Sequence, residues 1–322
     1  MKERTDSKYP FVSIIIIAKE VSEYLAECME TCLNLDYPEF EIIFLPDKEE
    51  CLNYKDVSVV PTGETGPAMK RNMGVKEAKG EIVAFIDDDV YPTKSWLKNA
   101  VRNFIDPEVA AVGGPAVTPD KDGVMQKASG LVYSSKLVSG EYSYRYTKGT
   151  RKEVEDFPSC NLIVRKNIFE RLGGFNTNFW PGEDTVLCLE ITKKLGKKII
   201  YEPEALVYHH RRRLFKEHLK QVASYAKHRG YFVKRFPETS KRFSYFVPSL
   251  LVAGIVTGAF FTGLCVFFRS VYFIILGIYL ISVAFETVKS RNLLVFPGII
   301  STHFAYGIFF IKGLLSGKLE EE

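Results

Sequence analysis

Cysteine is scarce in this sequence, and no two cysteines form a CxxC pair. The 322-residue chain has six, at positions 28, 32, 51, 160, 188 and 265. Structural zinc sites and disulfide frameworks need cysteines at regular short spacings. We therefore predict buried thiols in a reducing compartment.

A signal peptide is also missing from the start of the sequence. The first ten residues, MKERTDSKYP, are polar and run into a short apolar block. A secretory signal would have a longer apolar core and a small-residue cleavage site. Internal repeats and low-complexity tracts are absent as well. We expect the first domain to lie in the cytoplasm.

Charge is unevenly distributed along the chain. Charged residues make up 25% of the sequence, and the net charge is +4. Between residues 211 and 243 there are eleven Lys or Arg and two Glu, so this segment carries +9 and the remainder −5. Long uncharged stretches follow residue 245. The pattern predicts a globular first part and a membrane-associated end.

Strand and helix patterns alternate over the first 210 residues. Apolar runs at 12–17, 41–45, 57–60 and 82–86 are typical of strands covered on both faces. Helices are predicted at 22–34, 66–79, 93–105 and 184–195, and residues 120–155 are expected to be loops with short elements. The alternation predicts an α/β fold with a mostly parallel sheet.

Three aspartates follow the strand predicted at 82–86. In the stretch AFIDDDVYP they are Asp87, Asp88 and Asp89. Adjacent carboxylates repel one another, and such a run is either a solvated turn or a site for a hard divalent cation. Ligands of open α/β sheets bind at the carboxyl ends of strands. The position therefore favours a site.

Three apolar stretches lie near the C-terminus. Residues 246–268 carry no charge over 23 residues, enough to cross a hydrocarbon core of about 30 Å. Residues 292–311 are a second candidate, and 271–285 are marginal with 15 residues. We predict three spans; two spans with a re-entrant segment are the alternative. Basic residues before 246, with Lys289 and Arg291, favour a cytoplasmic side for these loops.

The basic segment has an apolar face. Phe215, Leu219, Val222 and Ala226 fall on one side of a predicted helix, with Lys and Arg around them. Basic patches with aromatic residues occur in nucleic-acid-binding proteins. The position directly before a hydrophobic span favours an interfacial helix on anionic lipid instead. We predict membrane lipids as partners and no nucleic acid.

Six motifs, taken in order, resemble the family 2 glycosyltransferases of the GT-A fold. They are VSIIIIAKE (12–20), FEIIFLPD (40–47), KRNMG (70–74), GEIVAFIDDDV (80–90), GGFNTNFWPGED (173–184) and ALVYHHRRR (205–213). The resemblance implies a GT-A catalytic domain at 1–210, with a Rossmann-like mixed and mostly parallel sheet. A basic interfacial helix at 211–244 and an all-α transmembrane region at 245–316 would follow, as in membrane-bound members of the family.

The resemblance implies a nucleotide-sugar donor and a divalent cation, Mg²⁺ or Mn²⁺. Such a cation offsets the charge that grows on the diphosphate leaving group. The implied metal ligands are Asp89 and Asp87, with His209 completing the shell and His210 as the alternative.

Further positions are implied to bind the donor. A UDP-sugar is favoured, although the sequence departs from the family pattern at 17–19 and at LPDK, which leaves the base and the sugar open. The implied donor-binding residues are Ala18, Glu20, Asp47, Arg71, Asp87 and Asp88.

The PGED motif implies the catalytic base. Asp184 matches the family position that takes the proton of an acceptor hydroxyl, and Glu183 orients or tunes it. The alternative is that Asp184 caps a helix beginning at Thr185. Trp180 either stacks on an acceptor sugar or belongs to the core.

These residues imply a membrane-bound inverting glycosyltransferase. It would move one sugar from a nucleotide sugar to a lipid-linked or polysaccharide acceptor in cell-surface glycan synthesis. The processive Gln-x-x-Arg-Trp motif is absent from HHRRRLFKEHLKQ. One alternative is a polyprenyl-phosphate monoglycosyltransferase, similar to dolichol-phosphate-sugar synthases. The other is a non-catalytic nucleotide-sugar-binding membrane protein. We expect a multi-pass protein of the cell membrane with its catalytic domain on the cytoplasmic side.

Overall fold

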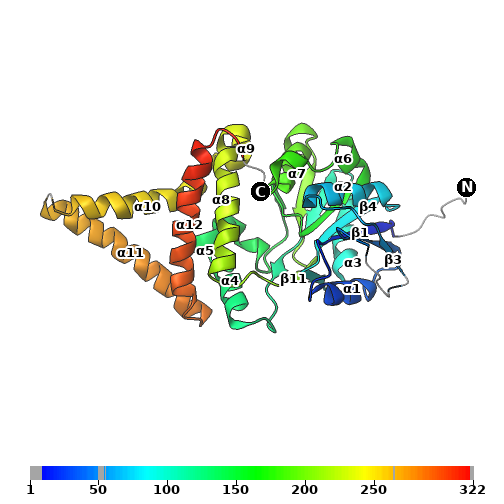
Figure 1. Ribbon diagram of the computed structural model, residues 1–322, viewed down its shortest axis with the longest axis horizontal. Helices are drawn as coiled ribbons and strands as arrows, with labels where there is room; N and C mark the ends of the chain where they lie inside the picture. Colours follow the sequence, from blue (N-terminus) through cyan, green and yellow to red (C-terminus); the bar gives the residue numbers. More distant parts are fainter. Residues whose placement is uncertain (1–8, 50–53, 55, 264, 320–322) are drawn as a thin grey trace, which may run out of the picture. The chain divides into compact units, whose positions relative to one another are not determined.

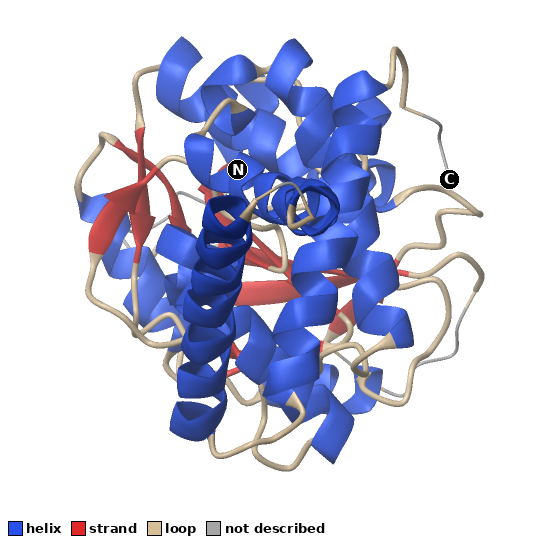
Figure 2. Cartoon of the chain, turned by 90° about the vertical axis from the view of Figure 1, so that its left-hand side faces the viewer, coloured by secondary structure: helices blue, strands red, loops and turns tan. Residues whose placement is uncertain are grey.

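The computed structural model describes residues 9–49, 54, 56–263 and 265–319. The chain, coloured along its sequence in Figure 1, divides into two compact units. Unit 1 comprises Met1–Val117 and Thr147–His210, and unit 2 comprises Thr118–Tyr146 and Arg211–Glu322. Every strand of the described residues, red in Figure 2, belongs to unit 1.

Unit 1 is built on a mixed eight-stranded sheet with the order β3-β2-β1-β4-β9-β6-β10-β8. The first four strands in this order are mutually parallel, as are β6 and β10, whereas β9 and β8 run antiparallel to their neighbours. The strands are β1 (Val12–Ile17), β2 (Phe40–Leu45), β3 (Val57–Val59), β4 (Ile82–Asp87), β6 (Val109–Gly113), β8 (Lys152–Val154), β9 (Asn161–Arg165) and β10 (Lys198–Tyr201). A smaller sheet has the order β5-β11-β7, with β5 (Val90–Pro92), β7 (Ala116–Val117) and β11 (Val207–His209).

Helices cover both faces of the large sheet. In Figure 1, α2, α6 and α7 lie on one face, and α1 and α3 lie on the other. These helices are α1 (Leu25–Leu33), α2 (Pro67–Glu77), α3 (Trp96–Val101), α6 (Lys166–Arg171) and α7 (Glu183–Leu189). Short 3₁₀ turns lie at Arg102–Ile105 and Thr177–Phe179, and a π turn at Glu190–Lys194 continues α7.

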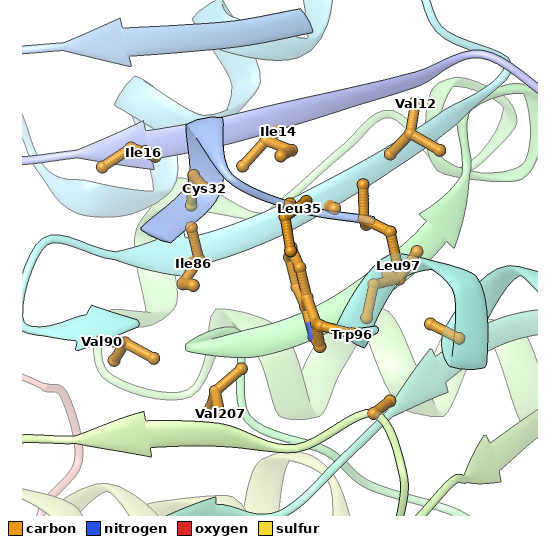
Figure 3. Close-up of a cluster of buried hydrophobic side chains, with 14 of the residues drawn as sticks. Val12, Ile14, Ile16, Cys32, Leu35, Ile86, Val90, Trp96, Leu97 and Val207 are labelled. Atoms are coloured by element: carbon orange, nitrogen blue, oxygen red, sulfur yellow. The ribbon is translucent and has the colours of Figure 1, made fainter. Parts of the chain in front are cut away.

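The alternation of side chains along β1 explains the two layers. Val12, Ile14 and Ile16 point into the cluster shown in Figure 3, together with Trp96 and Leu97 of α3. Ile15 points to the other face, towards α2. A Cβ at Gly74 of α2 would lie 2.8 Å from Ile15 Cγ2, so the glycine permits close helix-to-sheet packing.

A buried tryptophan joins the large sheet to the small one. Trp96 Nε1 donates to Asn161 Oδ1 at 2.8 Å, and Asn161 Nδ2 donates to the carbonyls of Gly114 and Ala205 at 2.8 and 2.9 Å. A Cβ at Gly114 would lie 1.7 Å from the Ala205 carbonyl oxygen, which no side chain tolerates. This junction fixes the segment before β11, the strand that carries His209.

Unit 2 is helical over its described residues. Its elements are α4 (Val124–Ser134), α5 (Lys136–Ser139), a 3₁₀ helix at Gly140–Arg145, α8 (Lys216–Arg235), α9 (Pro237–Ser240), α10 (Phe243–Phe261), α11 (Val266–Ser290) and α12 (Val295–Leu315). Ala128 and Val132 of α4 pack with Val295 and Ile299 of α12. The segment Thr118–Tyr146, which lies between β7 and β8 in the sequence, therefore belongs to unit 2. We predicted loops for most of it, because its polar, tyrosine-rich sequence masks the α4 periodicity.

Three helices of unit 2 are long and apolar enough to cross a membrane. α10, α11 and α12 have mean hydropathies of 1.7, 2.1 and 1.4 over their most apolar windows. The number agrees with the predicted three spans, but two boundaries were wrong. The stretch 246–268 is divided, since α10 ends at Phe261 and α11 begins at Val266. The marginal segment 271–285 is the middle of the 25-residue α11.

The apolar face predicted for the basic segment lies on α8 and the residue before it. Val222 and Ala226 are buried, and α8 packs closely along α12 (Figure 1). A Cβ at Gly230 of α8 would lie 2.1 Å from the Phe310 carbonyl oxygen, and one at Gly313 of α12 would lie 1.8 Å from the Lys227 carbonyl oxygen. This face therefore contacts protein.

The described cysteines are all free thiols. Cys28, Cys32 and Cys188 are buried as predicted, whereas Cys160 is half-buried and Cys265 is exposed in the turn between α10 and α11. The prediction for Cys51 lies outside the described residues.

Candidate active site

A buried arginine brings two of the acidic motifs together. Arg71 of α2 donates from Nη2 to Asp87 Oδ1 at 2.6 Å and from Nη1 to Glu183 Oε1 at 3.0 Å. Asp87 ends β4, and Glu183 begins α7. The DDD and PGED motifs, about a hundred residues apart, thus meet at one edge of the sheet. The predicted place of Arg71 beside the base or phosphate stays a prediction; within the protein, its guanidinium bonds these two carboxylates and lies 5.8 Å from the centroid of the Phe175 ring.

Asp184 lies in a setting that raises its proton affinity. Its Oδ1 accepts from Thr185 N at 2.7 Å and its Oδ2 from Ser159 N at 3.2 Å. Burial, and secondarily the carboxylate of Asp156, nevertheless raise the pKa of Asp184 above its ordinary value. A base with a raised pKa accepts a proton more readily near neutral pH.

Asp184 is not the N-cap residue of α7, although its side chain accepts from the first-turn N–H of Thr185. The N-cap of α7 is Gly182, whose φ of 132° favours glycine, and Asp184 is the second residue of the helix. Glu183 is almost completely buried, and burial with the nearby Asp184 charge raises its pKa to about 7. Its Oε2 accepts from Gly182 N at 3.0 Å, which anchors the motif.

Asp89, which directly precedes β5, and His209, the last residue of β11, lie next to each other at the small sheet. β5 and β11 are antiparallel, with His209 paired to Val90. His209 Nε2 lies 3.4 Å from Asp89 Oδ1, and both side chains are partly exposed. Burial, with the charges of Asp89 and Asp87, raises the pKa of Asp88 to about 6, opposed by a hydrogen bond with Ser22.

His210 has different neighbours. Its Nε2 lies 3.2 Å from Glu27 Oε2, and its ring stacks on Tyr24 at 4.1 Å between centroids. These contacts engage the buried His210 ring with α1 and the turn before it. Of the two candidate histidines, His209 is therefore the one beside Asp89.

The donor set fits a divalent cation shared with a substrate. Within the described ranges, no group of three or more His, Cys, Asp or Glu side chains is arranged to hold a metal ion. Mg²⁺-type sites commonly take one or two protein carboxylates and complete the shell with substrate phosphates and water. The adjacent carboxylate oxygen of Asp89 and imidazole nitrogen of His209 suit this arrangement.

The predicted base-binding positions gather at the ends of β1 and β2. Lys70 of α2, which is 2% exposed, donates from Nζ to the Ala18 carbonyl and forms an ion pair with Asp47 Oδ1. Asp47 N also donates to the Lys19 carbonyl at 3.2 Å. Glu20 is exposed at the same edge. Lys70 is not among the predicted site residues, although it stands next to Arg71 in the KRNMG motif.

Trp180 lies on the surface beside the PGED motif. Its side chain is 46% exposed, which excludes a core role. The preceding chain is held by Asn72, which donates to the Phe175 carbonyl and accepts from Phe175 N, both at 2.8 Å. Asn72, Ser159 and Asp156 are further positioning residues that the motifs did not reveal, because their partners are backbone groups or lie far away in sequence.

Comparison with known proteins identifies the class of this chain. The model of the family described as Glycosyl transferase family 2 matches residues 13–173, half of the chain. The chain belongs to this family.

Two relatives illustrate the range of similarity. A pre-mycofactocin glycosyltransferase of Mycobacterium tuberculosis is 30% identical over 173 residues, which is 54% of this chain and 36% of the relative. The chain thus spans about a third of that relative. A dolichyl N-acetyl-alpha-D-glucosaminyl phosphate 3-beta-D-2,3-diacetamido-2,3-dideoxy-beta-D-glucuronosyltransferase of Methanococcus voltae is 25% identical over 248 residues, covering 70% of this chain and 74% of the relative.

Two solved structures share the fold. The mannosyltransferase PcManGT from Pyrobaculum calidifontis, in complex with GDP-Man and Mn²⁺, superposes with a TM-score of 0.66 and 19% identity over 96% of this chain and 88% of its own. GalNAc-T7, with UDP, GalNAc and Mn²⁺, gives a TM-score of 0.52 at 16% identity over 74% of this chain and 52% of its own. The predicted GT-A fold with C-terminal helices is confirmed.

Proposed function

We propose that this protein is a membrane-bound inverting glycosyltransferase that moves one sugar from a nucleotide sugar to a lipid-linked acceptor. The Arg71 bridge between Asp87 and Glu183 carries the proposal, because it joins the donor and acceptor motifs at one edge of the sheet. Family membership and the three apolar helices support the reaction class and the membrane association.

In this mechanism the acceptor hydroxyl loses its proton to Asp184 as it attacks the anomeric carbon. Ser159 N and Thr185 N hold the carboxylate, and burial, together with the Asp156 charge, keeps the pKa of Asp184 raised. A single displacement on the face opposite the leaving nucleotide inverts the anomeric configuration. The exposed Trp180 supplies a flat apolar surface on which an acceptor sugar stacks.

The nucleotide diphosphate lies beside the DDD motif, at the carboxyl end of β4. Asp89 and His209 would hold Mg²⁺ or Mn²⁺ there, and the cation would offset charge on the departing diphosphate. Arg71 neutralises Asp87 and Glu183, so that the phosphates meet less negative charge. Ala18, Glu20 and Asp47 line the base end, and Asp88 supports the acidic turn.

A lipid-linked saccharide is the acceptor that we favour. The names of two archaeal relatives describe transfer to sugars on dolichyl phosphate: the Methanococcus voltae protein and a glucosyl-dolichyl phosphate glucuronosyltransferase of Haloferax volcanii. The acceptor group is then a sugar hydroxyl, which needs a base such as Asp184. We propose a cytoplasmic catalytic unit, with the exposed cations of α8 near anionic headgroups.

Transfer of radiolabelled sugar into a lipid fraction tests the proposal. Full-length protein in native membranes, given Mn²⁺ and UDP- or GDP-sugars, should label lipid-linked saccharides. Asp184→Asn should lower kcat by about 10²–10⁴-fold while nucleotide binding persists. Retained kcat in Asp184→Asn would favour a polyprenyl-phosphate acceptor, whose phosphate needs little base assistance. No transfer from any common donor would contradict the proposal.

A further inference from the structure

Lys70 connects the two strand ends that form the base end of the crevice. Its helix α2 covers the sheet, and its Nζ donates a hydrogen bond to the Ala18 carbonyl after β1 and forms an ion pair with the carboxylate of Asp47 after β2. β1 and β2 are paired in parallel register, so both positions lie at the carboxyl edge where ligands of such sheets bind.

The ion pair uses one defined oxygen of Asp47. Oδ1 is the oxygen next to Lys70, and it is buried. The side chain of Asp47 is 15% exposed, and that exposed part does not include Oδ1. An ionised carboxylate only accepts hydrogen bonds. Because Oδ1 is buried, the oxygen that Asp47 can present to a ligand at this edge of the sheet is Oδ2.

Nucleobases differ in how many adjacent donors they present. Uracil has one ring N–H between two carbonyl groups. Guanine has neighbouring N1–H and N2–H donors, which together match both oxygens of a free carboxylate in the bidentate manner. A carboxylate with one oxygen already occupied matches uracil.

We propose that Lys70 is a positioning residue that sets base specificity by occupying Asp47 Oδ1. The donor of the proposed reaction is then a uridine nucleotide sugar. The inference rests on the proposed function for the location of the nucleotide, and it adds a residue that makes the crevice selective for uracil over guanine.

Nucleotide binding without acceptor tests this role apart from transfer. Calorimetric titration of the full-length protein in detergent with Mn²⁺ should give UDP at least about tenfold tighter binding than GDP. Lys70→Met removes the cation that holds Oδ1 in the interior, so the carboxylate can turn both oxygens towards the base, and the two affinities should come within about threefold. Lys76→Met, on the exposed side of the same helix, should keep the wild-type ratio.

A second variant makes the test independent of the stability of Lys70→Met. In Asp47→Asn, the Lys70 ammonium group can donate only to the oxygen of the Asn side chain, so the NH₂ group of that side chain faces the base. This variant should bind CDP in preference to UDP by about tenfold, because N3 of cytosine is an acceptor. In Asp47→Asn combined with Lys70→Met the amide is free to turn, and the preference should disappear.

The outcomes separate this inference from the proposed function. If no nucleoside diphosphate binds the wild-type protein, the proposed function fails. If UDP and GDP bind but GDP is equal or tighter, the role of Lys70 is refuted while the function stands. A purely structural Lys70 would weaken all nucleotides by one common factor and leave every ratio unchanged, which also refutes the inference.

Discussion

Arg71 and Glu183 form a buried ion pair 3.0 Å long between α2 and α7, with side chains only 5% and 4% exposed. The same guanidinium holds Asp87, the last residue of β4. A planar guanidinium can serve two carboxylates at once, which a lysine ammonium on a flexible stem does less well. Arg71 therefore couples the PGED motif at the start of α7 to the end of β4.

Removing this cation should damage both stability and activity. Arg71→Met leaves two carboxylates, one of them deeply buried, without compensation, and the free energy of unfolding should fall by about 3–5 kcal/mol. Denaturant unfolding in detergent, followed by tryptophan fluorescence, measures the loss. Arg171→Met, at an exposed position on α6, should change stability by less than about 0.5 kcal/mol. Equal stability of the two variants would show that the bridge contributes little.

The pH dependence of transfer should reveal the environment of Asp184. The base acts only when deprotonated, and burial and Asp156 raise its pKa, so kcat should increase with pH through that raised pKa. Asp156→Asn removes one of the two causes. The acid limb of the kcat profile should then move to lower pH.

A neighbouring carboxylate provides the control for this shift. Glu155 is exposed and paired with Lys193 at 3.0 Å, so Glu155→Gln should leave the acid limb in place. The measurement compares the pH profiles of kcat for the wild-type, Asp156→Asn and Glu155→Gln proteins between about pH 5 and 8. If the acid limb of the kcat profile does not move in Asp156→Asn, then Asp184 is not the group whose protonation limits kcat.

The fold was predictable where a single apolar run in the sequence forms a single strand. The fully buried β1 and β4 read as continuous apolar stretches, and both were confirmed within a residue. The α4 helix was missed because its helical signal lies within a polar segment, and its partners lie far away in the sequence, in α8 and α12. The α10–α11 boundary was missed because a turn between two apolar helices needs no charged residue.

The candidate site was predictable as motifs but not as contacts. The order of the motifs indicated that Asp87 and Glu183 belong to one site. The contacts of Arg71 with both carboxylates were not predictable, since a sequence does not state which of several nearby anions an arginine will bind; its place beside the base or phosphate stays a prediction. The choice between His209 and His210 likewise depended on the β5–β11 register and on the stacking of His210 with Tyr24.

Loss of His209 should weaken metal binding, whereas loss of His210 should not. His209→Ala removes the imidazole beside Asp89, and the Mn²⁺ concentration for half-saturation of the UDP-loaded protein should rise by about tenfold or more. His210→Gln disturbs the contacts to Glu27 and Tyr24, and should lower the melting temperature without this rise. Electron paramagnetic resonance of free Mn²⁺ reports binding directly. The reverse pattern would transfer the ligand role to His210.

Close packing of α8 on α12 should depend on glycine at two points. A Cβ at Gly230 would meet the Phe310 carbonyl oxygen at 2.1 Å, so the backbone of one helix would have to shift. Gly230→Ala should therefore separate the helices and destabilise unit 2 by about 1–3 kcal/mol, the usual cost of overpacking.

Gly254 of α10 is the matched control, because its Cβ position has no atom within 4 Å. Alanine is also the better helix former, by about 0.5–1 kcal/mol, so Gly254→Ala should keep or raise the melting temperature in detergent. If Gly230→Ala melted at the same temperature as Gly254→Ala, α8 would not be held against α12 by backbone contact. The buried Val222 and Ala226 would then need another partner, and lipid, as the apolar pattern of the basic segment first suggested, would be the natural one.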